Sequence, residues 1–134
     1  MAKAKQSRRL ADNETQAFLK SCKSSAQKAR LVLDMIRGKS VDAALADLTF
    51  SKKAISVEIK KLLESAIANA ENNHDLNVDN LYIKATMADK SFQMKRWRCR
   101  ARGRMGKILK PRCHLTIVVA EKVKVEPKTN KEAA

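Results

Sequence analysis

Hydrophobic positions in the first third of the chain recur with helical spacing. Between residues 25 and 37 the apolar side chains lie three and four positions apart: Ala29, Val32, Leu33 and Ile36. Ser24 or Ser25 stands where a helix N-cap is favoured, and Gly38 stands where a helix end favours a left-handed residue. This pattern predicts a short helix.

Two more helices are predicted downstream. Ser40 restarts the helical pattern, Asp42 lies in the favourable first turn, and a short apolar stripe follows: Ala44, Leu45 and Leu48. Residues 52–72 form the longest predicted helix, with Ser51 as its N-cap. Its apolar face contains Ile55, Ile59, Leu62, Leu63, Ala66, Ile67 and Ala70. Turn-forming residues at 72–75 end this helix.

Other segments alternate with period two, as strands do. Residues 16–22 predict a short strand, with Ala17, Leu19 and Ser21 on one face and Phe18, Lys20 and Cys22 on the other. Beyond residue 80, Leu81, Ile83, Ala85 and Met87 alternate with Tyr82, Lys84, Thr86 and Ala88. Near the end, Leu115, Ile117 and Val119 alternate with His114, Thr116 and Val118. Two strands therefore flank the segment between them.

The chain length is typical of a single domain. It has 134 residues, of which 44% are hydrophobic, enough to build one core. We expect a flexible basic arm over residues 1–13, a globular domain over 14–121 and a flexible tail over 122–134. The longest apolar runs are four residues, at 43–46 and 117–120, so no membrane-spanning helix and no membrane partner are expected.

The net charge and its placement point to a polyanionic partner. Lys and Arg total 29 against 14 Asp and Glu, giving a formal charge of +15. Residues 90–112 hold ten cations and no acid: Lys90, Lys95, Arg96, Arg98, Arg100, Arg102, Arg104, Lys107, Lys110 and Arg112. Ten of the fifteen excess charges therefore lie in about a sixth of the chain. Such a concentration repels itself unless a polyanionic partner neutralises it, and on charge alone nucleic acid is the first candidate and an anionic membrane surface the second.

The spacing within this segment predicts a basic β-ribbon. Arginine recurs at every second position from 96 to 104, so Arg96, Arg98 and Arg100 share one strand face, opposite Trp97, Cys99 and Ala101. Gly103 provides a residue that tolerates positive φ, and a turn there folds the segment back on itself. With arms of about eleven residues the ribbon would reach roughly 35 Å. It must project into another molecule, and arginine suits bidentate contact with phosphate.

No catalytic or metal-binding constellation is found. Cys22, Cys99 and Cys113 form no CxxC pair, and no metal site or cofactor is expected. His114 adjoins Cys113, but neighbouring strand side chains point to opposite faces, which disfavours a nucleophile pair. No nucleotide-binding or hydrolase motif is present. The alternatives for the basic segment are a localisation tag, a DNA-architectural ribbon acting as a symmetric dimer, and an enzyme acting on RNA.

Several blocks of the sequence resemble one known family. They are SAQKARLVLDMIRGK at 25–39, LESAIANAENN at 63–73, MKR at 94–96, RARGR at 100–104 and HLTIVV at 114–119. In order and spacing, from about residue 14 to 121, they closely resemble the ribosomal protein L-twenty-two family of the bacterial large subunit. Separate blocks in the same order and spacing make a chance match improbable.

The resemblance implies an α+β fold, with three helices packed on a small three-stranded antiparallel sheet and a long protruding β-hairpin at about 90–112. It implies a non-enzymatic constituent of the large subunit, in the cytoplasm, that binds large-subunit rRNA, supports subunit assembly and lines the nascent-peptide exit tunnel. The implied partners are that rRNA, neighbouring large-subunit proteins and the nascent polypeptide, and the free protein is expected to be a monomer. An organellar ribosome stays open as an alternative.

The resemblance also assigns residues. Ser25, Lys28 and Arg30 match a block that meets rRNA in this family, and together with the ten cations of residues 90–112 they form the expected RNA-binding set. The expected tunnel-lining residues are Met94, Lys95, Arg96, Trp97, Arg100, Ala101, Arg102, Gly103 and Arg104. The chain departs from the family where many members have Glu-Gly-Pro at 90–92, Pro at Ala26 and Cys99, and Ala at Met105.

Overall fold

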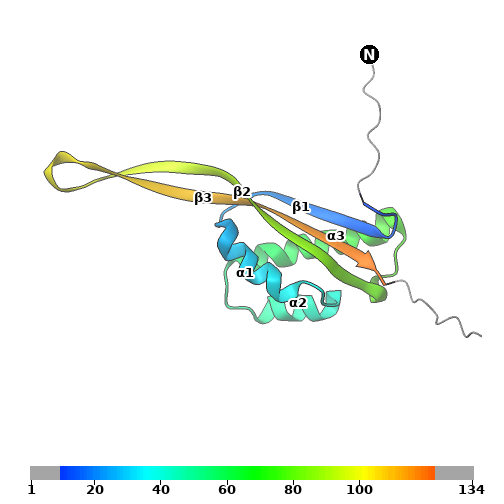
Figure 1. The fold of residues 1–134 in the computed structure, drawn as a ribbon. Coiled ribbons are helices and arrows are strands. Elements are labelled where there is room, and N and C mark those ends of the chain that lie inside the picture. The colour runs from blue at the N-terminus through cyan, green and yellow to red at the C-terminus, as the bar shows by residue number, and fades with distance from the viewer. Residues whose placement is uncertain (1–9, 123–134) are drawn as a thin grey trace, which may run out of the picture.

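The computed structural model describes residues 10–122, which form three helices and a three-stranded antiparallel sheet (Figure 1). The elements are β1 (Glu14–Cys22), α1 (Ala26–Ile36), α2 (Val41–Phe50), α3 (Ile55–His74), β2 (Leu81–Cys99) and β3 (Met105–Glu121). The strand order is β1-β3-β2, so β3 is central. The expected α+β fold with a protruding hairpin is confirmed, and the residues 1–9 of the expected arm and 123–134 of the expected tail lie outside the described range.

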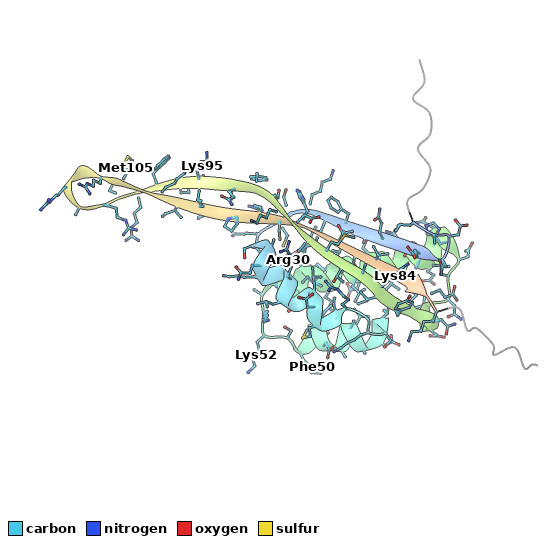
Figure 2. All side chains as sticks on the ribbon, in the orientation of Figure 1. Arg30, Phe50, Lys52, Lys84, Lys95 and Met105 are labelled. Carbon is cyan, nitrogen blue, oxygen red and sulfur yellow. The ribbon has the colours of Figure 1, made fainter. Side chains whose placement is uncertain are left out.

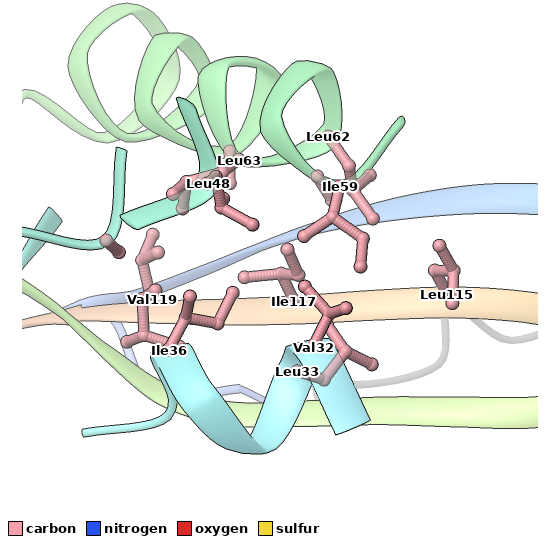
Figure 3. Close-up of a cluster of buried hydrophobic side chains, with 14 of the residues drawn as sticks. Val32, Leu33, Ile36, Leu48, Ile59, Leu62, Leu63, Leu115, Ile117 and Val119 are labelled. Carbon is pink, nitrogen blue, oxygen red and sulfur yellow. The ribbon is translucent and has the colours of Figure 1, made fainter. Parts of the chain in front are cut away.

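The core lies between the sheet and the helices, which all cover the same face of the sheet (Figures 1 and 3). Most of the apolar residues that define the predicted helix stripes are buried there. The largest fully buried side chains include Leu33, Ile36, Ile59, Leu63, Leu81, Ile83, Leu115, Ile117 and Val119. The apolar residues of the helices and those of the strands therefore form one shared core, and this core anchors the two strands that extend beyond the sheet.

The helix ends agree with the sequence-based prediction in two places and differ from it in a third. Ser25 is the N-cap of α1, and its hydroxyl accepts a hydrogen bond from Lys28 N at 3.4 Å. Gly38 adopts φ 78° just after α1, as expected. The predicted N-cap at Ser51 is wrong: Ser51 ends α2, and α3 begins at Ile55. The Ser51 hydroxyl instead accepts a hydrogen bond from Ser56 Oγ at 2.8 Å, bridging the two helices.

Two β-bulges change which side chains face the core. In β1 the register shifts between Leu19 and Cys22, and Ser21 adopts φ 55°. Cys22 is consequently buried, whereas Lys20 is exposed. The prediction from simple alternation, which placed both residues on one face, is therefore wrong. In β2 the register shifts between Ile83 and Ala85, so the buried positions continue at Thr86 and Ala88. The uninterrupted alternation predicted for residues 81–88 is therefore wrong.

Within residues 10–122 the outer face of the sheet has no helix over it and carries an ion pair (Figure 1). Glu14 on β1 and Lys84 on β2 pair across the central strand, where Val118 and Ala120 are buried. The hydrogen bond to Glu14 raises the pKa of Lys84 above its ordinary value. The ion pair thus links the two edge strands of the sheet, β1 and β2, over the central strand β3.

Candidate nucleic-acid interface

Beyond the domain, β2 and β3 continue as a two-stranded ribbon. Their pairing extends from Gln93 with Pro111 to Cys99 with Met105, whereas β1 ends at Cys22 and provides no third strand there. The ribbon projects far from the helices (Figure 1). A two-stranded ribbon with so little support buries almost nothing, and nearly every residue from 92 to 111 is exposed. The predicted hairpin is therefore confirmed as a protrusion.

The pairing register gives the ribbon two different faces. Arg96 lies opposite Ile108 and Arg98 opposite Gly106, so these pairs share one face. The other face carries Trp97 opposite Lys107 and Lys95 opposite Leu109. On this second face Trp97, Met105 and Leu109 are 60%, 64% and 47% exposed. One face is thus dominated by guanidinium groups, and the other combines lysines with uncovered apolar side chains.

The tip turns where Gly103 predicts it. Arg102 and Gly103 adopt φ 57° and 69°, and Arg104 N donates to Ala101 O at 3.4 Å. Arg100 N also donates to Arg104 O at 2.7 Å, which closes the loop. Left-handed φ is unfavourable for arginine, by roughly 1 kcal/mol, so the charge at Arg102 is held at the tip against local preference.

The cations of the ribbon have no acidic partner within the described part of the chain. Across residues 10–122 the ion pairs join Arg37 with Asp34, Lys39 with Asp47 and Lys84 with Glu14, all in the domain. The side chain of Arg96 donates only to the backbone oxygen of Lys95, at 2.9 Å. Figure 2 shows Lys95 and Met105 on the projecting arm, remote from the packed side chains of the domain. The charge is therefore available to an external anion.

Two arginines of the expected RNA-binding set also hold the fold together. Arg112, half-buried at the ribbon base, donates from Nη1 to Ser21 O at 3.0 Å, and its buried Nε has no acceptor among the described residues. Arg30 donates from Nη2 to Ala88 O at 3.0 Å and so ties α1 to β2. Lys28 and Lys90 are exposed without such bonds in the described residues. Ser25 lies at the start of α1 as its cap.

Sequence reasoning missed three lysines that the fold brings close to this surface. Lys20 and Lys23 at the end of β1 and Lys53 before α3 line an open groove together with Lys28 and Arg112. They come from two segments about thirty positions apart, the end of β1 and the loop before α3, and no spacing in the sequence links the two. The register shift at Ser21, which no periodicity predicts, sets where the β1 lysines lie.

The cysteines and histidines form no reactive site. Cys22 and Cys113 are buried, and Cys99 is exposed on the ribbon. Burial raises the pKa of both buried thiols, that of Cys113 to about 11. His114 stacks on Phe18 with ring centroids 5.6 Å apart and accepts a hydrogen bond from Ser21 N, pointing away from Cys113's buried face. Among residues 10–122 no cluster of possible metal ligands and no helix long and apolar enough to span a membrane is found.

Comparisons with known proteins converge on one family. The model of the family described as ribosomal protein L22p/L17e matches residues 17–120. The chain is 58% identical over 121 residues to large ribosomal subunit protein uL22 of Agrobacterium fabrum, covering 90% of this chain and 94% of the relative. The proteins of the same name from Jannaschia sp. and Brucella suis are 57% and 58% identical, covering 96% and 94% of the relatives.

Proposed function

This chain belongs to the ribosomal protein L22p/L17e family, and on that basis we propose that its ribbon binds large-subunit rRNA and lines the nascent-peptide exit tunnel. Members of the family are structural ribosomal proteins and not enzymes, and in bacteria they belong to the cytoplasmic ribosome. The DNA-architectural and enzymatic alternatives raised by the basic segment are accordingly set aside.

The observation that carries the RNA-binding proposal is the uncompensated charge of the ribbon. Residues 90–112 contain ten cations and no acid, and in the structure none of the ten forms an ion pair with the described residues. Bringing these charges together on a slender hairpin costs electrostatic free energy, which phosphates from converging rRNA segments offset. Guanidinium groups at alternate positions suit bidentate contact with phosphate oxygens.

The two faces of the ribbon suggest a division of roles. The face with Arg96 and Arg98 contacts phosphate, whereas Trp97 and its apolar neighbours contact bases or the tunnel lumen. The tunnel-lining residues are those of the upper arm and tip, from Met94 to Trp97 and from Arg100 to Arg104. Lys28 and the ribbon cations bind rRNA directly, while Arg30 and Arg112 also position the surface through their backbone contacts.

The partners follow from this arrangement. Large-subunit rRNA surrounds the ribbon, neighbouring large-subunit proteins contact the domain, and the nascent polypeptide passes the tip. The free protein is a monomer, because the proposed surface is complementary to RNA and repels a second copy of itself.

The salt dependence of rRNA binding tests the proposal. If about half of the ten ribbon cations meet phosphate, the logarithm of the affinity falls with the logarithm of salt concentration at a slope of roughly −4. Replacing Arg96, Arg98 and Arg100 with Gln should reduce the magnitude of this slope by about 2 to 3. A control variant with Gln at Lys39, Lys60 and Lys122 loses the same charge from the domain and should keep most of the slope. Equal slopes for both variants would exclude the ribbon as the binding element.

A further inference from the structure

An open groove of about 870 Å³ lies where the end of β1 meets the beginnings of α1 and α3. Four lysines and an arginine line it: Lys20, Lys23, Lys28, Lys53 and Arg112. Glu58 is the acidic residue among its lining. The groove is therefore a second concentration of positive charge, in the domain rather than on the ribbon.

This charge is not neutralised within the described chain. The four lysines take part in none of the ion pairs found across residues 10–122. Lys28 even lies in the first turn of α1, where the helix dipole is positive and an acidic side chain would be favoured. The start of α1, an 11-residue helix with no acidic residue in its first turn, adds to the positive potential of the groove, whereas Glu58 in the first turn of α3 offsets the start of that helix. An anionic occupant offsets all of these unfavourable terms together.

The groove also exposes apolar surface between the cations. Leu19, Leu31 and Ile55 line it, and Leu31 is 60% exposed although it lies on a helix with a well-packed opposite face. Inorganic phosphate or the backbone of a duplex would leave this apolar surface uncovered. An unstacked nucleotide covers it with the base or ribose while its phosphates meet the lysines, which is how proteins recognise single-stranded RNA.

The wall of the groove is fixed by hydrogen bonds. Ser21, held at φ 55°, donates its N–H to His114 Nδ1 at 3.2 Å and accepts from Arg112 Nη1 at 3.0 Å. Ser24 N donates to Cys22 O at 2.9 Å, and Ser25 then caps α1. The lysines at positions 20 and 23 thus flank a defined backbone, which lowers the entropy lost on binding.

We propose that this groove binds a single-stranded segment of RNA and seats one unstacked nucleotide on its apolar floor. The inference rests on the proposed function and deepens it, because Arg112 belongs both to the groove and to the base of the ribbon. Arg112 therefore places the groove next to the base of the ribbon, within reach of an RNA strand that leaves the ribbon. The domain therefore reads an unpaired rRNA segment while the ribbon contacts phosphate.

NMR of the isotope-labelled full chain tests this directly. A single-stranded 12-nucleotide oligouridylate should shift backbone amide signals of residues 19–31 and 53–58 as well as those of the ribbon. A 12-base-pair RNA duplex should shift the ribbon signals only. Shifts confined to the ribbon with both probes would refute the groove as an RNA-binding site and leave the proposed function of the ribbon standing. No shifts with either probe would overturn both. Equal groove shifts with the duplex, or groove shifts with hexaglutamate but not with oligouridylate, would refute single-stranded RNA as the occupant.

Charge removal gives an independent measurement on the same oligouridylate. Replacing Lys20, Lys23 and Lys53 with Gln should weaken binding about tenfold near physiological salt and reduce the magnitude of the salt slope by about 2. The control with Gln at Lys39, Lys60 and Lys122 should bind within about twofold of the unmodified protein. Circular dichroism establishes that both variants are folded. Equal losses in the two variants would overturn the groove as the binding site.

Discussion

The buried side chains of Cys22 and Cys113 meet across the β1–β3 ladder, where the register pairs the two residues directly. The pairing exists only because the bulge at Ser21 turns Cys22 inward. Burial is the largest cause of the raised pKa of both thiols, and their contact further raises that of Cys113, to about 11. Two cysteines 91 positions apart in sequence thus form one inert element of the core.

We expect the three thiols to differ sharply in reactivity. At about pH 8 an alkylating reagent should modify the exposed Cys99 rapidly, whereas Cys22 and Cys113 should react only on unfolding, because the thiolate is the nucleophile and both are buried and protonated. Mass spectrometry of timed samples measures the order, and a denatured sample provides the control. Simultaneous modification of all three in native protein would contradict the buried arrangement.

The raised pKa of the Cys113 thiol predicts that stability depends on pH. The pKa of Cys113 is raised from 9.0 to about 11 in the fold, so between these values the unfolded chain loses a proton that the native chain retains. The free energy of unfolding should therefore fall as pH rises from about 9 to 11. Denaturant titrations of the unmodified protein and Cys113→Val should show a smaller decline in the variant. Parallel declines would refute this source of pH dependence.

The ribbon should open far more readily than the domain strands from which it grows. Residues 115–119 of β3 pair with both β1 and β2, whereas residues 105–111 pair with β2 alone and are mostly exposed. Amide hydrogen exchange in free protein should be fast over 93–111 and slow over 115–119. Bound rRNA should slow exchange in the ribbon. Equal protection of both segments without RNA would contradict the weakness of the isolated hairpin.

The Arg30 guanidinium should matter to folding through its geometry rather than its charge. Arg30→Lys keeps the positive charge but loses the bond from Nη2 to Ala88 O. We expect this variant to lose about 1 kcal/mol of stability while binding rRNA nearly as well as the unmodified chain. Thermal unfolding and filter binding separate the two effects, with Lys28→Arg as the control. A large loss of RNA affinity in folded Arg30→Lys would instead assign Arg30 a direct bidentate contact.

Two glycines near the tip provide a matched test of the turn. Gly103 has φ +69°, so Gly103→Ala should destabilise the turn by about 1 kcal/mol. A Cβ at Gly106 would approach Arg100 Nε at 2.9 Å, but that contact is the far part of a flexible side chain, so Gly106→Ala should cost much less. Exchange of the Arg104 amide, which donates to Ala101 O, reports the turn. Equal effects of the two substitutions would contradict a conformational role for Gly103.

Periodicity predicted the elements well where one local rule governs the backbone. The cap at Ser25, the left-handed residue at Gly38 and the turn at Gly103 each rest on the chemistry of a single residue, and all three are present. The alternation of the arginines placed Trp97 and Cys99 on the ribbon face that does not carry Arg96 and Arg98, and the register confirms this. The family resemblance provided how these elements pack, with three helices on one three-stranded antiparallel sheet.

The bulges and the groove could not be predicted in this way. A bulge inserts one residue into a ladder, and the hydrogen bonds that hold it at Ser21 come from Arg112 and His114, more than ninety positions away. Ser51 was misassigned because two helices follow each other so closely that one serine satisfies the pattern of both a start and an end. The groove lysines converge only after these long-range contacts are in place.

β3 is one unbroken strand from the tip to the far side of the domain, and this fixes the reach of the hairpin. A slip by one residue along β3 would rotate Leu115 and Ile117 from the core to the opposite face. The packing of the domain therefore determines how far the hairpin extends from it. Because the core fixes the register of β3, the position of the domain sets the distance to Arg102 at the tip to within the length of one residue.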